Sequence, residues 1–182
     1  MELCMRTRIE GADDIPRYVD HLRGASFETA WTELSVLPLS SSMRGAQVAV
    51  PIDVATRQRL DDIEEFVRSN VIIPADLQAY RKSVVYKSLY RGPSMYMKIH
   101  PDCTCFVFDV NCRSIQMEVD EDVPCFSFHL PKPFDMIPVK DFKNRRARYR
   151  FKVNLSTVYI GPHVNGSLVS LIPSIDAIFV DS

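Results

Sequence analysis

From residue 84 onward, apolar and polar residues alternate with a period of two, and this pattern constrains the fold more than any other feature of the chain. The segments that show it most clearly are 114–119, 125–130 and 149–155. The pair Asn165-Gly166 stands between two further strand-like runs, 157–160 and 168–172, and predicts a hairpin turn. Because no helical segment separates these strands, we expect an antiparallel sheet of hairpins and not a parallel doubly wound sheet.

The first 82 residues show helical spacing instead. One helix is predicted to start at Asp13 or Asp14 and to end at Gly24. A second helix is predicted to begin at Ser26, since apolar residues recur after it at intervals of three and four. Serine and glycine residues then predict a flexible loop near 39–50.

The longest helix is predicted to follow Asp53, a favourable N-cap residue, and a short helix to begin at Pro74. Charged residues of the longest helix are expected mainly on its solvent side; they are Arg57, Arg59, Asp61, Asp62, Glu64 and Glu65. These patterns predict an α+β fold in one structural domain. A helical region, residues 1–82, packs on one face of an antiparallel sheet, residues 83–182.

Composition excludes several classes of protein. The formal net charge is -1, so any attraction to nucleic acid must come from a local concentration of cations. Only 6 glycines argue against glycine-rich phosphate loops, and we expect no cofactor. We expect no signal peptide and no membrane span, and the 5 cysteines, an odd number, predict a reducing, cytoplasmic location.

The most concentrated charge of the chain lies between residues 140 and 152. Its cations are Lys140, Lys143, Arg145, Arg146, Arg148, Arg150 and Lys152. On a strand, the last four share one face, because every second residue points the same way. This basic strand predicts a binding site for an anionic partner. The alternative is that acids of the same protein pair with it; the candidates are Glu118, Asp120, Glu121 and Asp122.

Cysteine and histidine residues gather between residues 100 and 129. A zinc site would use Cys103, Cys105, Cys125 and His129, but the spacing of the first two does not match a zinc knuckle, and buried free thiols are the more common arrangement. A hydrolase would combine one of the cysteines with His100 or His129 and with an acid, Asp102 or Asp109. A nuclease would instead use clustered carboxylates, for which the candidates are Asp109, Glu118 and Asp120.

Aromatic residues are frequent in the second half of the chain, and most occupy positions that predict a core. Three tyrosines stand near cations and are candidates for surface contacts with unstacked bases: Tyr86, Tyr90 and Tyr96, beside Lys87, Arg91 and Lys98.

Together these features predict a non-enzymatic interaction protein. We expect it to self-associate as a homo-oligomer and to bind nucleic acid or an acidic protein surface through the basic strand. The alternative is a small hydrolase or nuclease, or a zinc-binding regulatory protein. With its helical first half, antiparallel second half and basic strand, the chain resembles in overall character the small structural or accessory proteins of RNA viruses, such as matrix proteins; the resemblance covers no specific motif.

Overall fold

The computed structural model describes residues 1–9, 14–37, 39–42, 45–80, 83–90, 92–108, 134–143 and 145–181. Within these ranges, eleven strands form one mixed sheet. The strands are β1 (Glu2–Ile9), β2 (Arg17–Arg23), β3 (Ser26–Glu28), β4 (Thr32–Leu34), β5 (Leu39–Ser42), β6 (Gly45–Pro51), β7 (Val84–Lys87), β8 (Ser94–Phe108), β9 (Phe134–Pro138), β10 (Ala147–His163) and β11 (Gly166–Asp181). The helical elements are α1 (Val54–Asn70), α2 (Ala75–Tyr80) and the short 3₁₀ helix η1 (Val139–Asp141).

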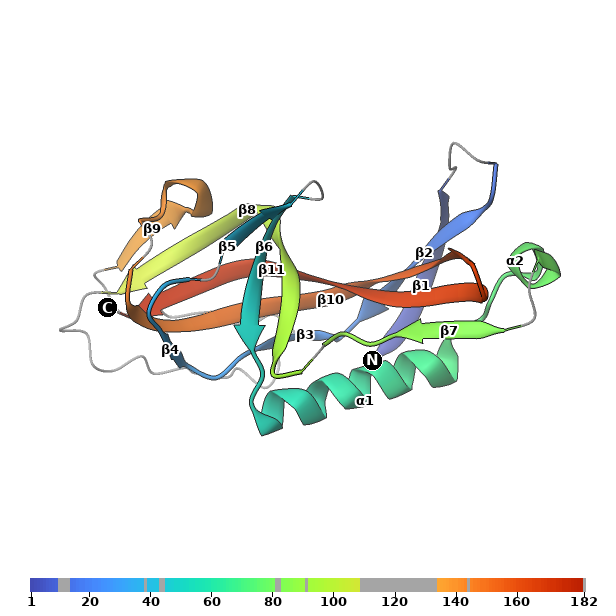
Figure 1. Cartoon of the computed structure of the whole chain (residues 1–182), viewed down its shortest axis with the longest axis horizontal. Coiled ribbons are helices and arrows are strands. Elements are labelled where there is room, and N and C mark those ends of the chain that lie inside the picture. The colour runs from blue at the N-terminus through green and yellow to red at the C-terminus, as the bar shows by residue number, and fades with distance from the viewer. Residues whose placement is uncertain are drawn as a thin grey trace.

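The long hairpin of β10 and β11 runs the length of the molecule, and the other strands pair with it directly or through a neighbouring strand (Figure 1). Its turn falls at Asn165-Gly166, as predicted, with His163 opposite Gly166. The alternation in β10 is also confirmed, since Tyr149, Phe151 and the two apolar residues that follow at the same spacing are fully buried. A period of two therefore located the central strand correctly.

The prediction of a purely antiparallel sheet is wrong. Strand β11 pairs in parallel with β7 and with β8. Strands β6 and β9 pair antiparallel with β8, and β10 pairs antiparallel with β11. Hydrophobic period predicts that a segment is a strand, but it does not specify the neighbour of that strand. Here β11 lies beside β7 and β8, two strands that come much earlier in the sequence, and it runs in the same direction as both.

The prediction of a helical first half is also wrong, because the segment predicted as its first helix forms β2. Asp20 occupies a buried position of that strand, where an apolar residue would have revealed the alternation. Its carboxylate accepts two hydrogen bonds of 2.8 Å from the guanidinium of Arg6 on β1. Gly24, predicted as the helix stop, takes a φ of 77° in the turn after β2.

The second predicted helix is replaced by β3 and β4, which both pair with β10. Thr29, between them, exchanges hydrogen bonds with Phe151: its N–H donates to the Phe151 carbonyl (3.0 Å), and its hydroxyl accepts from the Phe151 N–H (3.1 Å). Pairing with a central strand thus overrides the helical spacing of this segment. The flexible loop predicted near 39–50 falls on the hairpin of β5 and β6.

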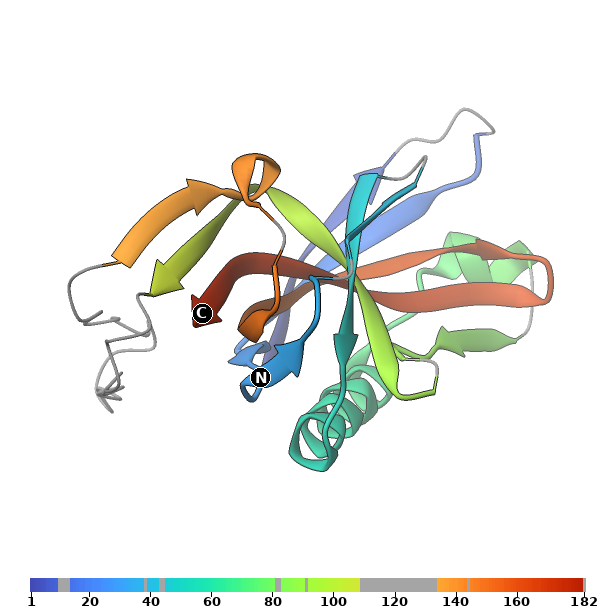
Figure 2. The same ribbon diagram turned by 60° about the vertical axis from the view of Figure 1, so that its left-hand side comes forward.

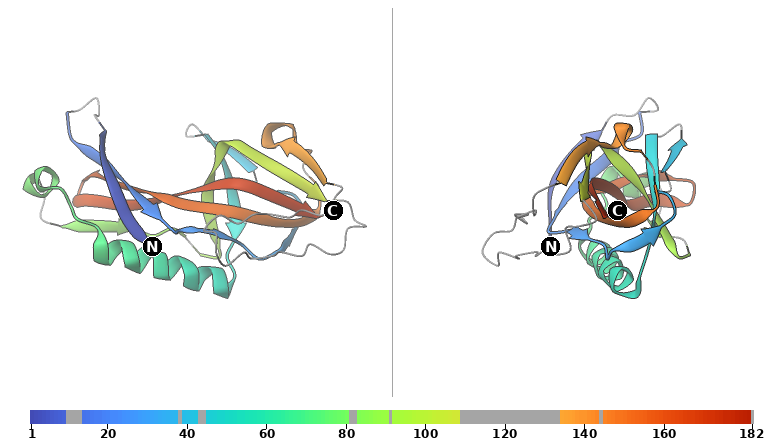
Figure 3. Two further views of the ribbon diagram at one scale, coloured as in Figure 1. Left: turned by 180° about the vertical axis from the view of Figure 1, so that it is seen from behind. Right: turned by 90° about the vertical axis from the view of Figure 1, so that its left-hand side faces the viewer.

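The two later helices are confirmed. Asp53 caps α1 and accepts a hydrogen bond from the Thr56 N–H (2.6 Å), and α2 begins directly after Pro74. Helix α1 lies along one side of the sheet and buries Leu60, Ile63 and Val67 against it (Figure 3). In the described part of the chain, no helix is long and apolar enough to cross a membrane.

The sheet has one face against α1 and one open face. On β8, Met95 and Met97 point to the core, whereas Tyr96 and Lys98 point outward. Strand β8 bends sharply (Figure 2), because its first part pairs with β6 and its second part with β9. The two predicted strands at 114–119 and 125–130 lie outside the described residues.

Candidate nucleic-acid interface

The alternation of the basic strand is as predicted, but its arginines bind acids of the same chain. Arg146 contacts Glu33 at 2.5 Å, Arg148 contacts Asp181, and Arg150 contacts Glu28 at 2.9 Å. Lys152 also has an interaction partner. These acids lie on β3, β4 and β11, whereas the predicted partners, Glu118 and Asp120 to Asp122, lie outside the described residues. Three of the four cations on this face are therefore already neutralised within the protein.

Arg148 is further fixed by the ring of Trp31, whose centroid lies 5.9 Å from the guanidinium carbon. The remaining predicted cations lie before β10: Lys140, Lys143 and Arg145 are exposed. Their side chains form no ion pair with the acids that the structure describes. The predicted basic site thus has two parts. Arg146, Arg148 and Arg150 form ion pairs within the protein. The three exposed cations that precede them form none with a described acid.

The two described cysteines of the predicted zinc or catalytic cluster are core residues. Cys103 and Cys105 are 2% and 0% exposed, and burial raises the pKa of both thiols to about 12. Both thiols therefore pack as small apolar groups in the core, the more common arrangement for free cysteines. His100 is exposed, three residues from the buried Cys103, and Cys125, His129 and Asp109 lie outside the described residues.

A cleft opens where β11 changes its neighbour. Its parallel ladder with β7 ends at Ser170, opposite Lys87, and its ladder with β8 begins at Ser174, opposite Lys98. Between these points, residues 171–173 have no paired strand on this edge within the described chain. Pro173 suits that position, because proline has no N–H to leave unpaired.

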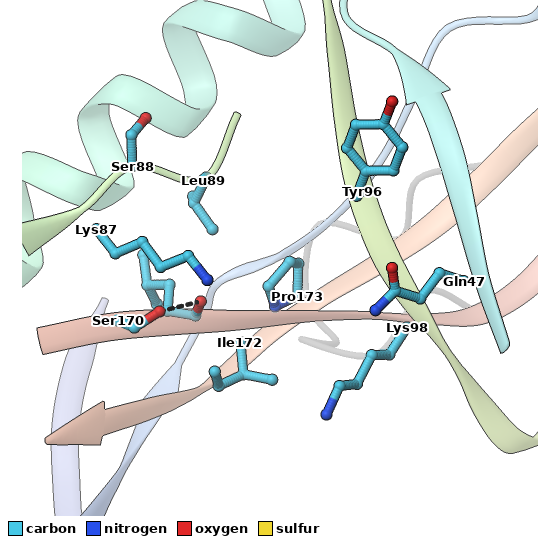
Figure 4. Close-up of a pocket in the computed structure, with 10 residues that line it drawn as sticks. Gln47, Lys87, Ser88, Leu89, Tyr96, Lys98, Ser170, Ile172 and Pro173 are labelled. Carbon is cyan, nitrogen blue, oxygen red and sulfur yellow. Dashed lines mark hydrogen bonds between the residues drawn. The ribbon is translucent and has the colours of Figure 1, made fainter. Parts of the chain in front are cut away.

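The cleft has a volume of about 410 Å³. It is lined by Gln47, Lys87, Ser88, Leu89, Tyr96, Lys98, Ser170, Leu171, Ile172 and Pro173. Lys87 lies on one side of Pro173, and Tyr96, Lys98 and Gln47 lie on the other (Figure 4). Both lysines are exposed, and neither forms an ion pair with a described acid. The cleft therefore carries two cations that the protein does not neutralise itself.

Polar side chains of α1 hold the loop that forms one wall of this cleft. Glu64 accepts a hydrogen bond from the Leu89 N–H (2.6 Å), and Asp61 accepts one from the Tyr90 hydroxyl (2.5 Å). Arg57 donates to the Gly92 carbonyl (3.1 Å). The expectation that these helix residues mainly face solvent missed this role. Its signal was present in the sequence, since the three residues recur at helical spacing on one stripe.

The three tyrosines singled out from the sequence have different surroundings. Arg68 lies 5.4 Å from the Tyr86 ring, and Arg57 lies 5.0 Å from the Tyr90 ring. The hydrogen bond to Asp61 also raises the pKa of the Tyr90 hydroxyl. Tyr96 is 61% exposed and has no such contact among the described residues. Of the three, Tyr96 is the ring that remains available to a ligand.

Comparison with models of known protein families, with curated proteins and with solved structures finds no match for this chain. The resemblance to viral matrix proteins relied on a helical first half, which the structure replaces with strands. The cleft is therefore the feature of the described residues that bears most directly on function.

Proposed function

We propose that this protein is a non-enzymatic binding protein for single-stranded nucleic acid, and that the cleft between β7, β8 and β11 is its binding site. One observation carries the proposal. Tyr96, whose ring is exposed, and the exposed Lys98 lie two residues apart on the same face of β8, and Lys87 stands on the other side of the same cleft. An aromatic surface flanked by cations is the arrangement that binds unstacked bases and their phosphates.

The charge of the cleft supports an anionic ligand. The chain as a whole has a formal net charge of -1, so it does not attract polyanions in general. Lys87 and Lys98 form a local concentration of positive charge, whereas the arginines of the basic strand form ion pairs with Glu28, Glu33 and Asp181. Phosphate groups in the cleft would release counterions without breaking an internal ion pair.

Tyr96 favours nucleic acid over an acidic protein segment. Stacking of one base on an aromatic ring contributes about 1 to 3 kcal/mol, which an acidic side chain cannot supply. Gln47 is paired with Lys98 across β6 and β8, and its amide offers both a donor and an acceptor to a base edge. A duplex keeps its bases stacked on each other, so this site favours a single strand.

The chemistry of the lining residues supports binding without catalysis. The ten described residues that line the cleft include no carboxylate, no imidazole and no thiol, the groups that most often act as general acid, general base or metal ligand. The hydroxyl of Ser170 donates to the Leu171 carbonyl (3.2 Å). We also propose a reducing, cytoplasmic location, which accords with the free thiols of Cys4, Cys103 and Cys105.

Fluorescence anisotropy with labelled oligonucleotides tests the proposal. We expect a ten-nucleotide single strand to bind more tightly than a duplex of equal length. Tyr96→Ala should weaken binding by about tenfold, in line with the loss of one stacked base, and Tyr96→Phe should preserve it. If the protein binds neither RNA nor DNA single strands at low salt, the proposal is wrong; retention of polyglutamate instead would assign the cleft to an acidic protein partner.

The single tryptophan provides an internal control for the position of the ligand. Trp31 contacts Arg148 in the basic strand, so its emission reports on that strand. Binding in the cleft should leave the emission nearly unchanged, and the double variant Arg146→Ala, Arg148→Ala should bind as the wild type does. A large change of emission on binding would place the ligand on the basic strand instead.

A further inference from the structure

The register of the sheet places a second tyrosine on the open face beside Lys87. Ser170 of β11 pairs with Tyr159 of β10 on one side and with Lys87 of β7 on the other. Paired residues on neighbouring strands point to the same face, so these three side chains form one row across the sheet. Neighbouring strands lie about 4.8 Å apart, which puts the backbones of Tyr159 and Lys87 about 10 Å from each other.

The side chain of Tyr159 lies along its own strand, where Gly161 leaves room for the ring. A Cβ atom added at Gly161 would clash with the hydroxyl, Cζ and Cε1 atoms of the Tyr159 ring, so the ring occupies the space above Gly161. Tyr159 is half-buried, and its hydroxyl has no hydrogen-bond partner among the described residues. A ring placed over a backbone that bears no side chain is a surface on which a base can stack.

A second row repeats this combination further along β11. Ser174 pairs with Lys98 of β8, which in turn pairs with Gln47 of β6, and Tyr96 lies two residues from Lys98 on the same face. Lys98 thus has a tyrosine two residues away on its own strand, and Lys87 has one in the same row two strands away. The two rows are four residues apart along β11, which is about 13 Å at 3.3 Å per residue.

From this arrangement we propose that Tyr159 and Lys87 form a second nucleotide subsite, and that the ligand is a polynucleotide chain and not a free nucleotide. The inference rests on the proposed function of the cleft. One base stacks on Tyr96 with its phosphate near Lys98, and a later base of the same strand stacks on Tyr159 with its phosphate near Lys87. A single nucleotide occupies one of the two rows, because about 13 Å separates them.

Anisotropy with fluorescein-labelled oligouridines of two to ten nucleotides tests the inference. Wild-type affinity should rise with length until the strand spans both rows. Tyr159→Ala should weaken binding of the ten-nucleotide strand about tenfold and flatten the dependence on length, whereas Tyr159→Phe should stay within about twofold of the wild type. Thr157→Ala is the matched control, since Thr157 lies on the same face two residues earlier, and it should bind like the wild type.

The outcomes separate the two proposals. If Tyr159→Ala and Thr157→Ala bind the ten-nucleotide strand equally well while Tyr96→Ala weakens it, the second subsite is wrong and the proposed function stands. If the wild type binds no single strand, the proposed function fails and the subsite with it. Thermal unfolding of each variant shows whether a loss of binding reflects a loss of folding, and Tyr159→Phe carries the comparison if Tyr159→Ala does not fold.

Discussion

The Glu64 carboxylate accepts a hydrogen bond of 2.6 Å from the backbone N–H of Leu89, and this contact joins the only long helix described to the wall of the cleft. Leu89 is 8% exposed, so water does not readily replace the acceptor. The helix therefore does more than cover the sheet. It fixes the loop after β7, and with it the position of Lys87 relative to Lys98.

Glu64→Ala should destabilise the protein by about 1 to 3 kcal/mol, because it leaves a buried N–H without an acceptor. Urea unfolding followed by circular dichroism measures the change. Glu65→Ala is the matched control: Glu65 is exposed on the same helix and should change the free energy of unfolding by no more than about 0.5 kcal/mol. Equal effects of the two variants would show that the hydrogen bond to Leu89 does not hold the loop.

Gly166 should tolerate no side chain. Its φ is 153°, and an added Cβ would clash with the Ser83 carbonyl, which accepts a hydrogen bond from the Ser167 N–H at the start of the β7 ladder. Gly166→Ala should therefore cost about 2 kcal/mol or more and should disturb the pairing of β7. Gly92→Ala should cost only about 1 kcal/mol, because Gly92 has a φ of 63° but open space around it. Differential scanning calorimetry of both variants checks the order, and a smaller loss for Gly166→Ala than for Gly92→Ala would contradict it.

The ion pair of Arg6 and Asp20 should stabilise the hairpin of β1 and β2. Asp20→Ala leaves the guanidinium without its bidentate acceptor in a partly buried site, and we expect a loss of about 2 to 4 kcal/mol. Glu33→Ala breaks the exposed pair with Arg146 and should cost less than about 1 kcal/mol. Chemical denaturation of the two variants distinguishes the buried pair from the exposed one, and similar losses would contradict the assignment.

This same ion pair explains why the first half of the fold was hard to predict. Asp20 takes a core position of β2 because Arg6 neutralises it, and a charged residue in the stripe conceals a period of two. In the segment after it, Thr29 and Glu28 are buried through contacts with β10, more than a hundred residues away in the sequence. Such pairing leaves no local trace. Where the buried stripe is apolar, as in β10, or the signal is local, as at Asp53, the sequence was sufficient.

The candidate site could likewise be predicted only in part. The alternation that places four cations of the basic strand on one face was predictable. Their acidic partners were not, since Glu28, Glu33 and Asp181 come from distant segments. Tyr96 and Lys98 were recognisable as a local pair of aromatic and cation. Their meeting with Lys87 depends on where β11 exchanges β7 for β8, a relationship that only the tertiary fold determines.

The buried thiol of Cys105 should make stability fall at alkaline pH. Burial raises its pKa from 9.0 to about 12, so above pH 9 the unfolded chain loses the proton that the folded protein keeps. Stability from this group is present below pH 9 and is lost between pH 9 and 12, with a slope of up to about 1.4 kcal/mol per pH unit. Burial raises the pKa of Cys103 to the same value, so Cys105→Ala should reduce the combined fall by about half, measured as urea midpoints from pH 8 to 11. Val107→Ala, on the same strand, should lower stability without changing the slope.

The salt dependence of binding tests the central claim most directly, because it reports how many phosphates the cations of the protein neutralise. Affinity for a single strand falls as the salt concentration rises. The magnitude of the slope of log affinity against log salt concentration is smaller by about 0.7 for each phosphate that a variant no longer neutralises. We predict that Lys98→Ala reduces the slope by about this amount and that Arg148→Ala leaves it unchanged, since Arg148 is paired with Asp181. A slope that falls in Arg148→Ala and stays unchanged in Lys98→Ala would move the binding site to the basic strand and contradict the account.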